Sequence, residues 1–467
     1  MRLLFLTNLY PPYGKGGYEE WCQEVALQLR KRGHEVIVLT SIHGSGSEGH
    51  SDPNWVRREL HLEMELVSLR NGVQFFTARQ QRVRANFETV RSYVRRFQPD
   101  VVLVWGMWNI VRSVPILVEK LMPERVIYYM GDYWPTLPSQ FEFYWKAPAQ
   151  HWYTQLPKSI LGFFANAIMA TEELPKPAFE RVIFPTIFMR NELVKRGVKP
   201  SESIVIYGAA DTASYDERKA QTQRPCVAEQ IRDDTALQND YFIHRVQRDE
   251  KPPTDADALV NNALDPVQSA STMSNSAPAV NREKITLLWA GRLRSDKGAH
   301  VAIKAIAKVV HHYALTNFEL VIVGSGEADY QTFLEYLVRK ERLQPYVRFL
   351  GQQQKETMPT LYQQADIFLF TSIWQEPFGR VLIEAMAAGT AVIGSMVGGA
   401  SEILVENENS LTYPPGDAER LAAQIVRLIR APDLRERLAT QGKEVALAQF
   451  DIQRMATEIE AYIKTVI

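Results

Sequence analysis

The sequence predicts an α/β protein of two doubly wound, Rossmann-like domains that face each other across a cleft. In both halves of the chain, short apolar runs that end in glycine alternate with amphipathic segments, which is typical of βαβ units. A polar stretch without strong periodicity separates the halves, and 467 residues exceed one ordinary domain. We expect domains at 1–211 and 284–446, an insert at 212–283, and a last helix at 447–467, for which crossing back to the first domain is one option.

The N-terminal half begins with a predicted strand at 2–7, an amphipathic helix at 18–32 and a second strand at 34–40. Gly33 follows the helix and suits a left-handed C-cap. The runs 101–105 and 126–130 are continuously apolar, as in parallel strands covered on both faces. A further strand is expected at 204–207.

Residues 212–283 are rich in Gln, Asp, Asn, Ser, Pro and Thr, and 265–279 contain almost no large apolar side chains. Such a segment buries too little apolar surface to fold, and folded connections are normally far shorter. We therefore expect a poorly ordered insert or linker.

The C-terminal half shows the alternation more clearly. Strands are predicted at 285–289, 318–323, 347–350, 367–371 and 391–394, with helices at 298–310 and 380–388. The chain from 418 to the end is expected to be helical, with breaks near Pro432 and Asp451. Ligands of such sheets bind at the carboxyl ends of the strands.

The composition limits the classes of function that we expect for this chain. Hydrophobic residues make up 46% and charged residues 23%, and the formal net charge is −1, so no nucleic-acid partner is expected. Cys22 and Cys226 are far apart and are expected to be reduced thiols in a cytoplasmic protein. The first apolar run is too short for a secretory leader, and no run is long enough to span a membrane. We interpret the most lipophilic stretch, 160–170, as a buried helix.

Glu376 and Glu384 form the first candidate site. Glu376 follows a predicted strand, and Glu384 lies about one turn into the next helix, which Gly379 opens. The N–H groups and the positive dipole end of that helix suit a diphosphate, and a carboxylate one turn inside suits ribose hydroxyls. The alternative, a plain helix start with an exposed glutamate, stays open.

Arg292 and Lys297 form the second candidate site, in a turn between a predicted strand and a helix. Both side chains can neutralise the charge that grows on a departing diphosphate. The alternative is a solvated basic turn. Glycine turns recur after the strands, but none matches the dinucleotide fingerprint in full, so a nicotinamide enzyme is disfavoured.

Together these motifs resemble glycosyltransferase family four, a large family of retaining enzymes with the GT-B fold. The resemblance is specific over 285–445 and looser over 1–211. It is carried by TNLYPPYGKGGYE, GRLRSDKG, VIVGSGE, VRFLGQ, EPFGRVLIEAMAAGTAVIGSMVGGASEIL and NSLTYPPGDAERLA.

The resemblance implies a role for each matching residue. Glu376 would lie near the donor sugar, Glu384 would bind the ribose, and Arg292 and Lys297 would bind the diphosphate. It also implies that no metal or other cofactor is required. The remaining donor-binding positions would be the phosphate loop at Gly16 and Gly17, the nucleotide border at Gly324, Gly326 and Gly351, and the pocket lining at Phe378, Gly379, Arg380 and Val381.

The sequence departs from the family in two places. Family members often have His-Asp where this chain has Gly131-Asp132, and that histidine usually contacts the sugar. Asp132 remains a candidate catalytic carboxylate, with a turn-capping aspartate as the alternative. The second departure is the insert at 212–283, where members normally have far fewer residues.

The leading hypothesis is a retaining, metal-independent glycosyltransferase of the hexosyltransferase type. It would move sugar from a nucleotide-sugar donor on the C-terminal half to an unknown acceptor on the N-terminal half. Two alternatives stay open: a catalytically silent nucleotide-sugar-binding partner protein, and a sugar-nucleotide epimerase.

The basic stretch 79–96 contains six arginines and only one acidic residue, Glu88. Several of these arginines share a helix face, which fits peripheral contact with an anionic inner-membrane surface. A solvated helix is the alternative. The arginines are Arg79, Arg82, Arg84, Arg91, Arg95 and Arg96.

Overall fold

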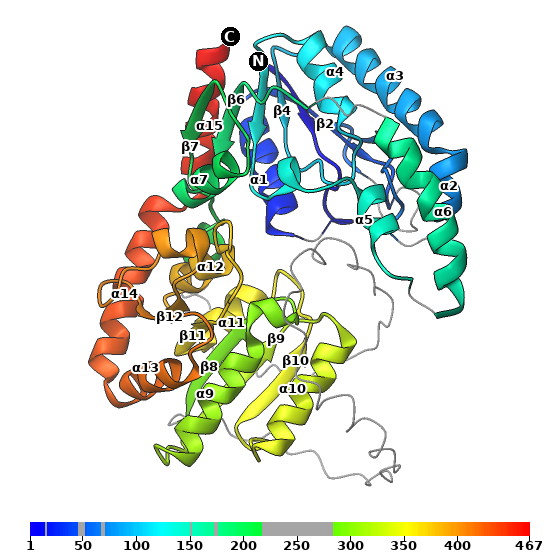
Figure 1. Cartoon of the computed structure of the whole chain (residues 1–467). Coiled ribbons are helices and arrows are strands. Elements are labelled where there is room, and N and C mark those ends of the chain that lie inside the picture. Colours follow the sequence, from blue (N-terminus) through cyan, green and yellow to red (C-terminus); the bar gives the residue numbers. More distant parts are fainter. Residues whose placement is uncertain (15, 45–51, 67–70, 150–151, 172–175, 217–283) are drawn as a thin grey trace.

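Two parallel sheets, each covered by helices, form the two halves of the molecule (Figure 1). The computed structural model describes residues 1–14, 16–44, 52–66, 71–149, 152–171, 176–216 and 284–467. The strand orders are β3-β2-β1-β4-β5-β6-β7 and β10-β9-β8-β11-β12-β13. Both are doubly wound orders, so the predicted α/β class is confirmed.

The N-terminal sheet is parallel throughout its named strand pairs. Its strands are β1 (Arg2–Leu6), β2 (Glu35–Ser41), β3 (Val56–Leu60), β4 (Val101–Val104), β5 (Val126–Tyr129), β6 (Arg181–Phe184) and β7 (Glu202–Val205). The helical elements of this half are α1 (Gly17–Lys31), α2 (Asn71–Thr77), α3 (Arg79–Phe97), α4 (Ser113–Leu121), η1 (Trp134–Thr136), α5 (Gln140–Lys146), α6 (Trp152–Thr171), α7 (Ile187–Lys195) and α8 (Ala213–Asp216).

The C-terminal sheet is also parallel. Its strands are β8 (Ile285–Ala290), β9 (Phe318–Val323), β10 (Val347–Gly351), β11 (Ile367–Phe370), β12 (Ala391–Ser395) and β13 (Leu411–Tyr413). The helical elements are η5 (Ser295–Lys297), α9 (Ala299–His311), α10 (Ala328–Lys340), α11 (Met358–Gln364), α12 (Arg380–Ala387), η6 (Gly398–Glu402), α13 (Ala418–Arg430), α14 (Pro432–Gln449) and α15 (Ile452–Val466).

The apolar runs in the sequence become the centres of the sheets. All four residues of β4, β5 and β11 are buried, as expected for strands with helices on both faces. Such strands need no polar face, which is why their sequences lack the alternation of a half-exposed strand.

The two halves pack directly on each other along one side. Thr186 caps α7 and donates a 2.8 Å hydrogen bond to the Pro377 carbonyl of the other half. The Glu402 carboxylate accepts from the first backbone N–H groups of α7, at 2.9 and 2.6 Å. The Trp21 and Phe378 rings meet edge to face, with centroids 5.3 Å apart.

The last helix, α15, packs against α1 of the N-terminal half (Figure 1). Its entry is fixed by backbone hydrogen bonds from Ala210 to the Phe450 carbonyl and from Ile452 to the Ala210 carbonyl, both 3.0 Å. Arg32 then pairs with Glu460 at 3.0 Å. The chain therefore returns to its first half after completing the second.

One sequence-based interpretation is wrong. The stretch 160–170 does form a helix, part of α6, but the helix is not buried. Phe163 and Phe164 are 72% and 55% exposed, and Gly162 and Ala165 are its buried residues. Periodicity alone could not separate a buried apolar helix from an exposed one.

Most of the predicted insert at 212–283 lies outside the described residues, which resume at 284 after α8. Within the described part of the chain, every helix is too short or too polar to span a bilayer.

Candidate active site

The centre of the candidate site is an ion pair between Lys297 and Glu376, at the carboxyl ends of the neighbouring strands β8 and β11. Ser372 donates a 2.8 Å hydrogen bond to the same oxygen, Glu376 Oε1. The Glu376 side chain is 11% exposed and that of Lys297 is 28% exposed. The pair is thus largely shielded from water while one edge of the lysine stays accessible.

The fold brings Lys297 to Glu376 by pressing two loops together. Lys297 ends the short helix η5, and Gly298 follows with φ of 74°. A Cβ atom on Gly298 would lie 1.9 Å from the Thr371 carbonyl oxygen, so only glycine allows the loops this close. The sequence-predicted turn is therefore built to place its cation beside the loop carboxylate.

The loop at Gly16 and Gly17 lies against the C-terminal half. A Cβ atom on Gly16 would be 3.6 Å from the Arg292 Nη2 atom, and one on Gly17 would be 3.4 Å from Arg380 Cδ. Two arginines of one half therefore lie beside the glycine loop of the other.

Glu384 and Arg380 lie one turn apart on α12 and hydrogen-bond at 3.1 Å. Tyr362 donates to the other Glu384 oxygen at 3.1 Å. Burial raises the pKa of Glu384, and the Arg380 charge works in the opposite direction. Glu384 is therefore a buried group held by two partners. It is not the exposed glutamate expected if this segment were only a plain helix start.

Arg380 also reaches across to the N-terminal half. Its guanidinium forms a fork-like pair with Glu24 of α1, with N–O distances of 2.7 and 3.1 Å. Lys355 joins this cluster at 3.1 Å from both Glu20 and Glu24. Burial works against the charged form of Arg380, but the surrounding carboxylates outweigh it and raise its pKa.

The remaining donor-side residues fall into two groups. Gly324 and Gly326 follow β9, and Gly351 ends β10 and accepts a 2.9 Å hydrogen bond from the Gly324 N–H. A Cβ atom on Gly324 would lie 1.8 Å from the Gly291 carbonyl, so this turn supports the segment that carries Arg292. The Gly379 turn opens α12 with φ of 105°.

Phe378 differs from its expected position in a pocket wall. Its ring is 2% exposed and packs between Trp21 and Phe450, with centroid distances of 5.3 and 5.8 Å. Val381 is half-buried and packs against the same core. Because the ring is buried, the backbone of Phe378 is the part that can contact a ligand.

Asp132 is half-buried, directly after the buried Gly131. Its Oδ1 atom accepts a 3.0 Å hydrogen bond from the Trp134 N–H, so the turn-capping geometry is present. Burial raises the pKa of Asp132 to about 7, the Trp134 hydrogen bond lowers it, and Glu19 adds a smaller increase. A carboxyl group with such a pKa changes charge near neutral pH.

The Tyr18 ring lies where a side chain at position 131 would extend. A Cβ atom on Gly131 would lie 2.6 Å from Tyr18 Cδ2. The Tyr18 ring also packs against Trp105 and Tyr129, and its hydroxyl donates to the Tyr129 carbonyl. The tyrosine ring thus occupies the space next to Asp132 that a larger residue at 131 would need.

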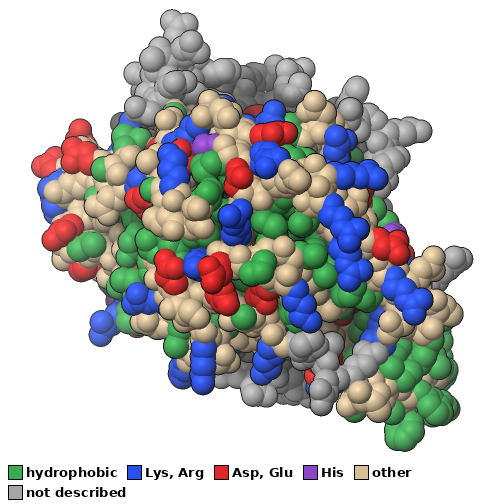
Figure 2. Space-filling view, turned by 90° about the horizontal axis from the view of Figure 1, so that it is seen from above, with side chains coloured by type: hydrophobic (Ala, Val, Ile, Leu, Met, Phe, Trp, Pro, Cys, Tyr) green, Lys and Arg blue, Asp and Glu red, His purple; other side chains and the backbone are tan. Residues whose placement is uncertain are grey.

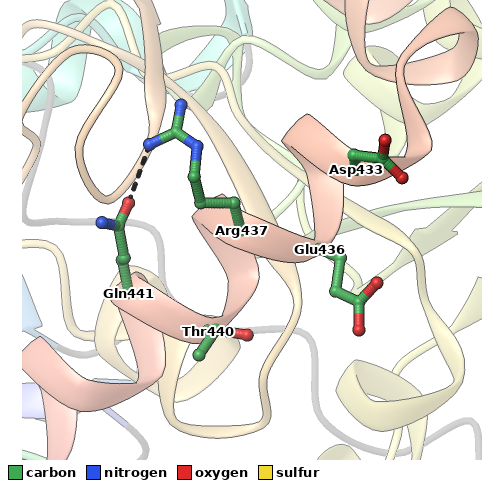
Figure 3. Close-up of a pocket in the computed structure, with 5 residues that line it drawn as sticks. All are labelled: Asp433, Glu436, Arg437, Thr440 and Gln441. Atoms are coloured by element: carbon green, nitrogen blue, oxygen red, sulfur yellow. Dashed lines mark hydrogen bonds between the residues drawn. The ribbon is translucent and has the colours of Figure 1, made fainter.

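Other parts of the described chain are less suited to this chemistry. Among the described residues, no three His, Cys, Asp or Glu side chains are grouped so as to hold a metal ion. A hollow of about 340 Å³ lies on α14, lined by Asp433, Glu436, Arg437, Thr440 and Gln441 (Figure 3). All five belong to one helix, and none is a predicted site residue.

Two family models match the chain, one over each half. "Glycosyltransferase Family 4" matches residues 15–214, and "Glycosyl transferases group 1" matches residues 274–445. The chain belongs to glycosyltransferase family 4. The resemblance stated from the motifs is thereby confirmed.

This family 4 protein spans about half the length of the curated relatives that it matches. An uncharacterised glycosyltransferase of Methanocaldococcus jannaschii is 30% identical over 44% of this chain and 53% of its own. A phosphatidyl-myo-inositol mannosyltransferase of Mycobacterium leprae is 32% identical over 39% of this chain and 46% of its own.

Solved structures share the whole architecture. A glycosyltransferase of Rickettsia africae covers all of this chain at 17% identity, with a TM-score of 0.65. Anabaena HepE, solved in complex with UDP and glucose, also covers all of it at 18% identity, with a TM-score of 0.61. This likeness confirms the GT-B fold.

Several residues of the site of this family 4 protein escaped the sequence analysis. Glu20 and Glu24 lie four positions apart, one helical turn, on a predicted helix, so their shared face was readable but their partners in the other half were not. Tyr18, Ser372 and Lys355 carry no pattern that marks them. Contacts within one half identify Tyr18 and Ser372, and contacts between the halves identify Lys355.

Proposed function

We propose that this protein transfers a hexosyl group from a nucleotide-sugar donor to an acceptor, with retention at the anomeric carbon. The observation that carries the proposal is a set of cations on the C-terminal half: Arg292 and Arg380 lie against the Gly16–Gly17 loop, and Lys297 pairs with Glu376. Such a set of cations beside a glycine loop suits a diphosphate that leaves with increasing negative charge.

In this proposal the C-terminal half holds the donor and the N-terminal half holds the acceptor. Arg292 and Lys297 neutralise the departing nucleoside diphosphate, which makes a metal ion unnecessary. Glu384 receives the ribose, and Glu376 orients or polarises the sugar. Lys297 would exchange its pairing with Glu376 for the diphosphate when the donor enters.

The comparisons support a nucleotide-sugar donor. HepE has the same fold and was solved with UDP, with UDP and glucose, and with UDP-glucose. The mycobacterial relatives named phosphatidyl-myo-inositol mannosyltransferase share sequence with part of this chain. A screen of UDP-, GDP- and ADP-sugars by thermal shift tests the choice of donor, because a bound ligand stabilises the native state by RT ln(1 + [L]/Kd).

Lys297→Ala tests the mechanism. Because Lys297 stabilises charge that develops only in the transition state, we expect kcat/KM for the stabilising donor to fall about 100-fold or more. Lys304→Ala is the matched control, since Lys304 lies exposed on the adjoining helix α9. Unchanged turnover in Lys297→Ala would contradict the assignment.

The second candidate function is a nucleotide-sugar-binding partner without turnover. It is favoured by one observation, the Tyr18 ring that fills the space beside Gly131 and Asp132. Tight donor binding with neither transfer nor slow donor hydrolysis, measured on the wild-type protein, would select this function over the first.

A further inference from the structure

Helix α6 exposes an unusual amount of apolar surface. Trp152 is 89% exposed, Phe163 72% and Leu156 70%, although soluble surfaces rarely gather such side chains. Only Gly162 and Ala165 of its twenty residues are buried, against a small core that includes Trp145 and Phe75. The helix therefore packs on the protein along a narrow strip, and most of its remaining surface is exposed.

The exposed apolar side chains share one side of the helix. At about 100° per residue, six of them fall within roughly half of the circumference, opposite the strip of Gly162 and Ala165. Helix α6 has no acidic residue, and its one charged residue is Lys158. The six are Trp152, Leu156, Ile160, Phe163, Phe164 and Ile168.

Helix α2 extends this apolar surface to the basic helix α3. It contacts both α6 and α3, and its Val73 and Phe76 are 59% and 41% exposed. On α3, Arg84, Arg91 and Arg95 are exposed and recur at positions that share one helix face. In Figure 2 hydrophobic side chains form a projecting corner at the lower right, with Lys and Arg side chains on the neighbouring surface.

We propose that α6, α2 and α3 together form a docking surface for a lipid bilayer that contains anionic phospholipids. Apolar and aromatic side chains enter the boundary of the acyl chains, while the nearby arginines pair with phosphate head groups. Trp152 and Tyr153, at the start of α6, are residue types that favour this interface.

A second copy of the chain fits this surface less well. A two-fold contact presents the same patch from both partners, so the arginines of α3 would face each other. The patch offers little acid to balance them, since α6 has none and the exposed face of α3 has one glutamate, Glu88, among three arginines. A bilayer with anionic head groups supplies the missing negative charge.

The surface also lies close in the chain to the candidate site. In the sequence, Asp132 is followed by η1, α5 and then α6. A bilayer held by α6 would thus adjoin the half that we propose binds the acceptor, which points to an acceptor embedded in that membrane. This last step rests on the proposed function, whereas binding of the bilayer does not.

Co-sedimentation of the full chain with vesicles tests the docking surface. One vesicle type is phosphatidylcholine alone, and the other is an equal mixture of phosphatidylcholine and phosphatidylglycerol. We expect the wild-type protein to sediment with the anionic vesicles, and Leu156→Ser/Phe163→Ser to partition at least about tenfold more weakly. The matched control is Phe333→Ser, at an exposed side chain of α10.

A charge-reversed variant, Arg84→Glu/Arg91→Glu, should lose the preference for anionic over neutral vesicles. Arg420→Glu on α13 is its control. Circular dichroism shows whether each variant is folded, and an unchanged thermal shift with the donor separates loss of docking from loss of donor binding.

Three results would overturn the proposal. The wild-type protein could stay in the supernatant with both vesicle types, or Leu156→Ser/Phe163→Ser could sediment like the wild type. A wild-type dimer that becomes a monomer in that variant, without vesicle binding, would instead assign the surface to a second copy.

Discussion

The Tyr18 ring determines how large a residue position 131 can hold. The Tyr18 ring fills the space above Gly131, so the glycine is required by packing as much as by the turn. A small residue at 131 and a large one at 18 form a complementary pair beside Asp132. At this departure from the family pattern, the glycine thus fits the tyrosine ring that packs on it.

Gly131→Ala should therefore destabilise the protein by about 1–3 kcal/mol, because its methyl group would overlap the Tyr18 ring. In a Tyr18→Ala background the same substitution should cost much less, since the ring is gone. Chemical denaturation of the wild type, both single variants and the double variant measures this coupling. Additive effects would show that the two residues do not share the space.

Asp132 should make stability depend on pH. Its pKa is raised to about 7 by burial, so the folded protein retains a proton that the unfolded chain has already lost. Stability therefore falls as the pH rises from about 4 to 7, and no further loss from this group follows above 7. Asp132→Asn keeps an acceptor for the Trp134 N–H and should lack this dependence.

Melting temperatures of the wild type and Asp132→Asn between pH 4.5 and 8.5 test this expectation. The variant should gain relative to the wild type up to about pH 7 and then run parallel to it. Parallel curves over the whole range would mean that Asp132 titrates like a carboxylate in water.

Sequence alone was sufficient for the residues that lie in local motifs. Arg292, Lys297 and Glu376 follow strands β8 and β11, and Glu384 lies within α12, so the local pattern places them beyond the carboxyl ends of the strands. Contacts between the halves are different in kind. Glu24 and Arg380 are 356 residues apart, and nothing in either segment encodes the other.

At the level of elements, helices α1 and α12 join the two halves at the site. The Arg380–Glu24 pair is shielded, with side chains 10% and 13% exposed, whereas Lys355 beside it is 50% exposed. A shielded, two-pronged arginine–carboxylate pair contributes more than an exposed lysine pair. The cluster is therefore held mainly by Arg380.

Glu24→Gln should lower the free energy of unfolding by about 1–3 kcal/mol, because a charge-assisted pair becomes a neutral contact and Arg380 loses a close counter-charge. Lys355→Met, which removes the exposed partner of the same glutamate, should change it by less than about 1 kcal/mol. Calorimetry on both variants makes the comparison. Equal losses would show that the pair does not dominate the cluster.

Helix α6 marks the limit of reasoning from periodicity. Its sequence is as apolar as a core helix, and its place in the chain says nothing of what covers it. Burial is decided by the neighbours, and here α5 and α2 contact only a narrow strip. An element that violates the expected pattern of burial is where a function beyond folding should be sought.

In the whole molecule, α15 belongs to the first half in space although it ends the second in sequence. The turn at Asp451 is fixed by Thr212, whose hydroxyl donates to Asp451 Oδ2 at 2.6 Å. The halves are thus linked near residue 211 and again near residue 451.

Ile459→Ala tests this assignment of α15. Ile459 is fully buried in the core that α15 shares with α1, so the cavity should cost about 2–5 kcal/mol. Ile467→Ala is the control, since Ile467 is 54% exposed and its loss should stay within about 0.5 kcal/mol.

The location of the damage is the decisive observation. Because α15 packs on α1, hydrogen exchange in Ile459→Ala should increase in β1, α1 and β2 of the first half, while α9 and β9 of the second stay protected. Donor binding, which we place on the second half, should then produce the same thermal shift for that half as in the wild type. If exchange became faster in α13 and β12 instead, α15 would support the C-terminal half, which it directly follows in sequence.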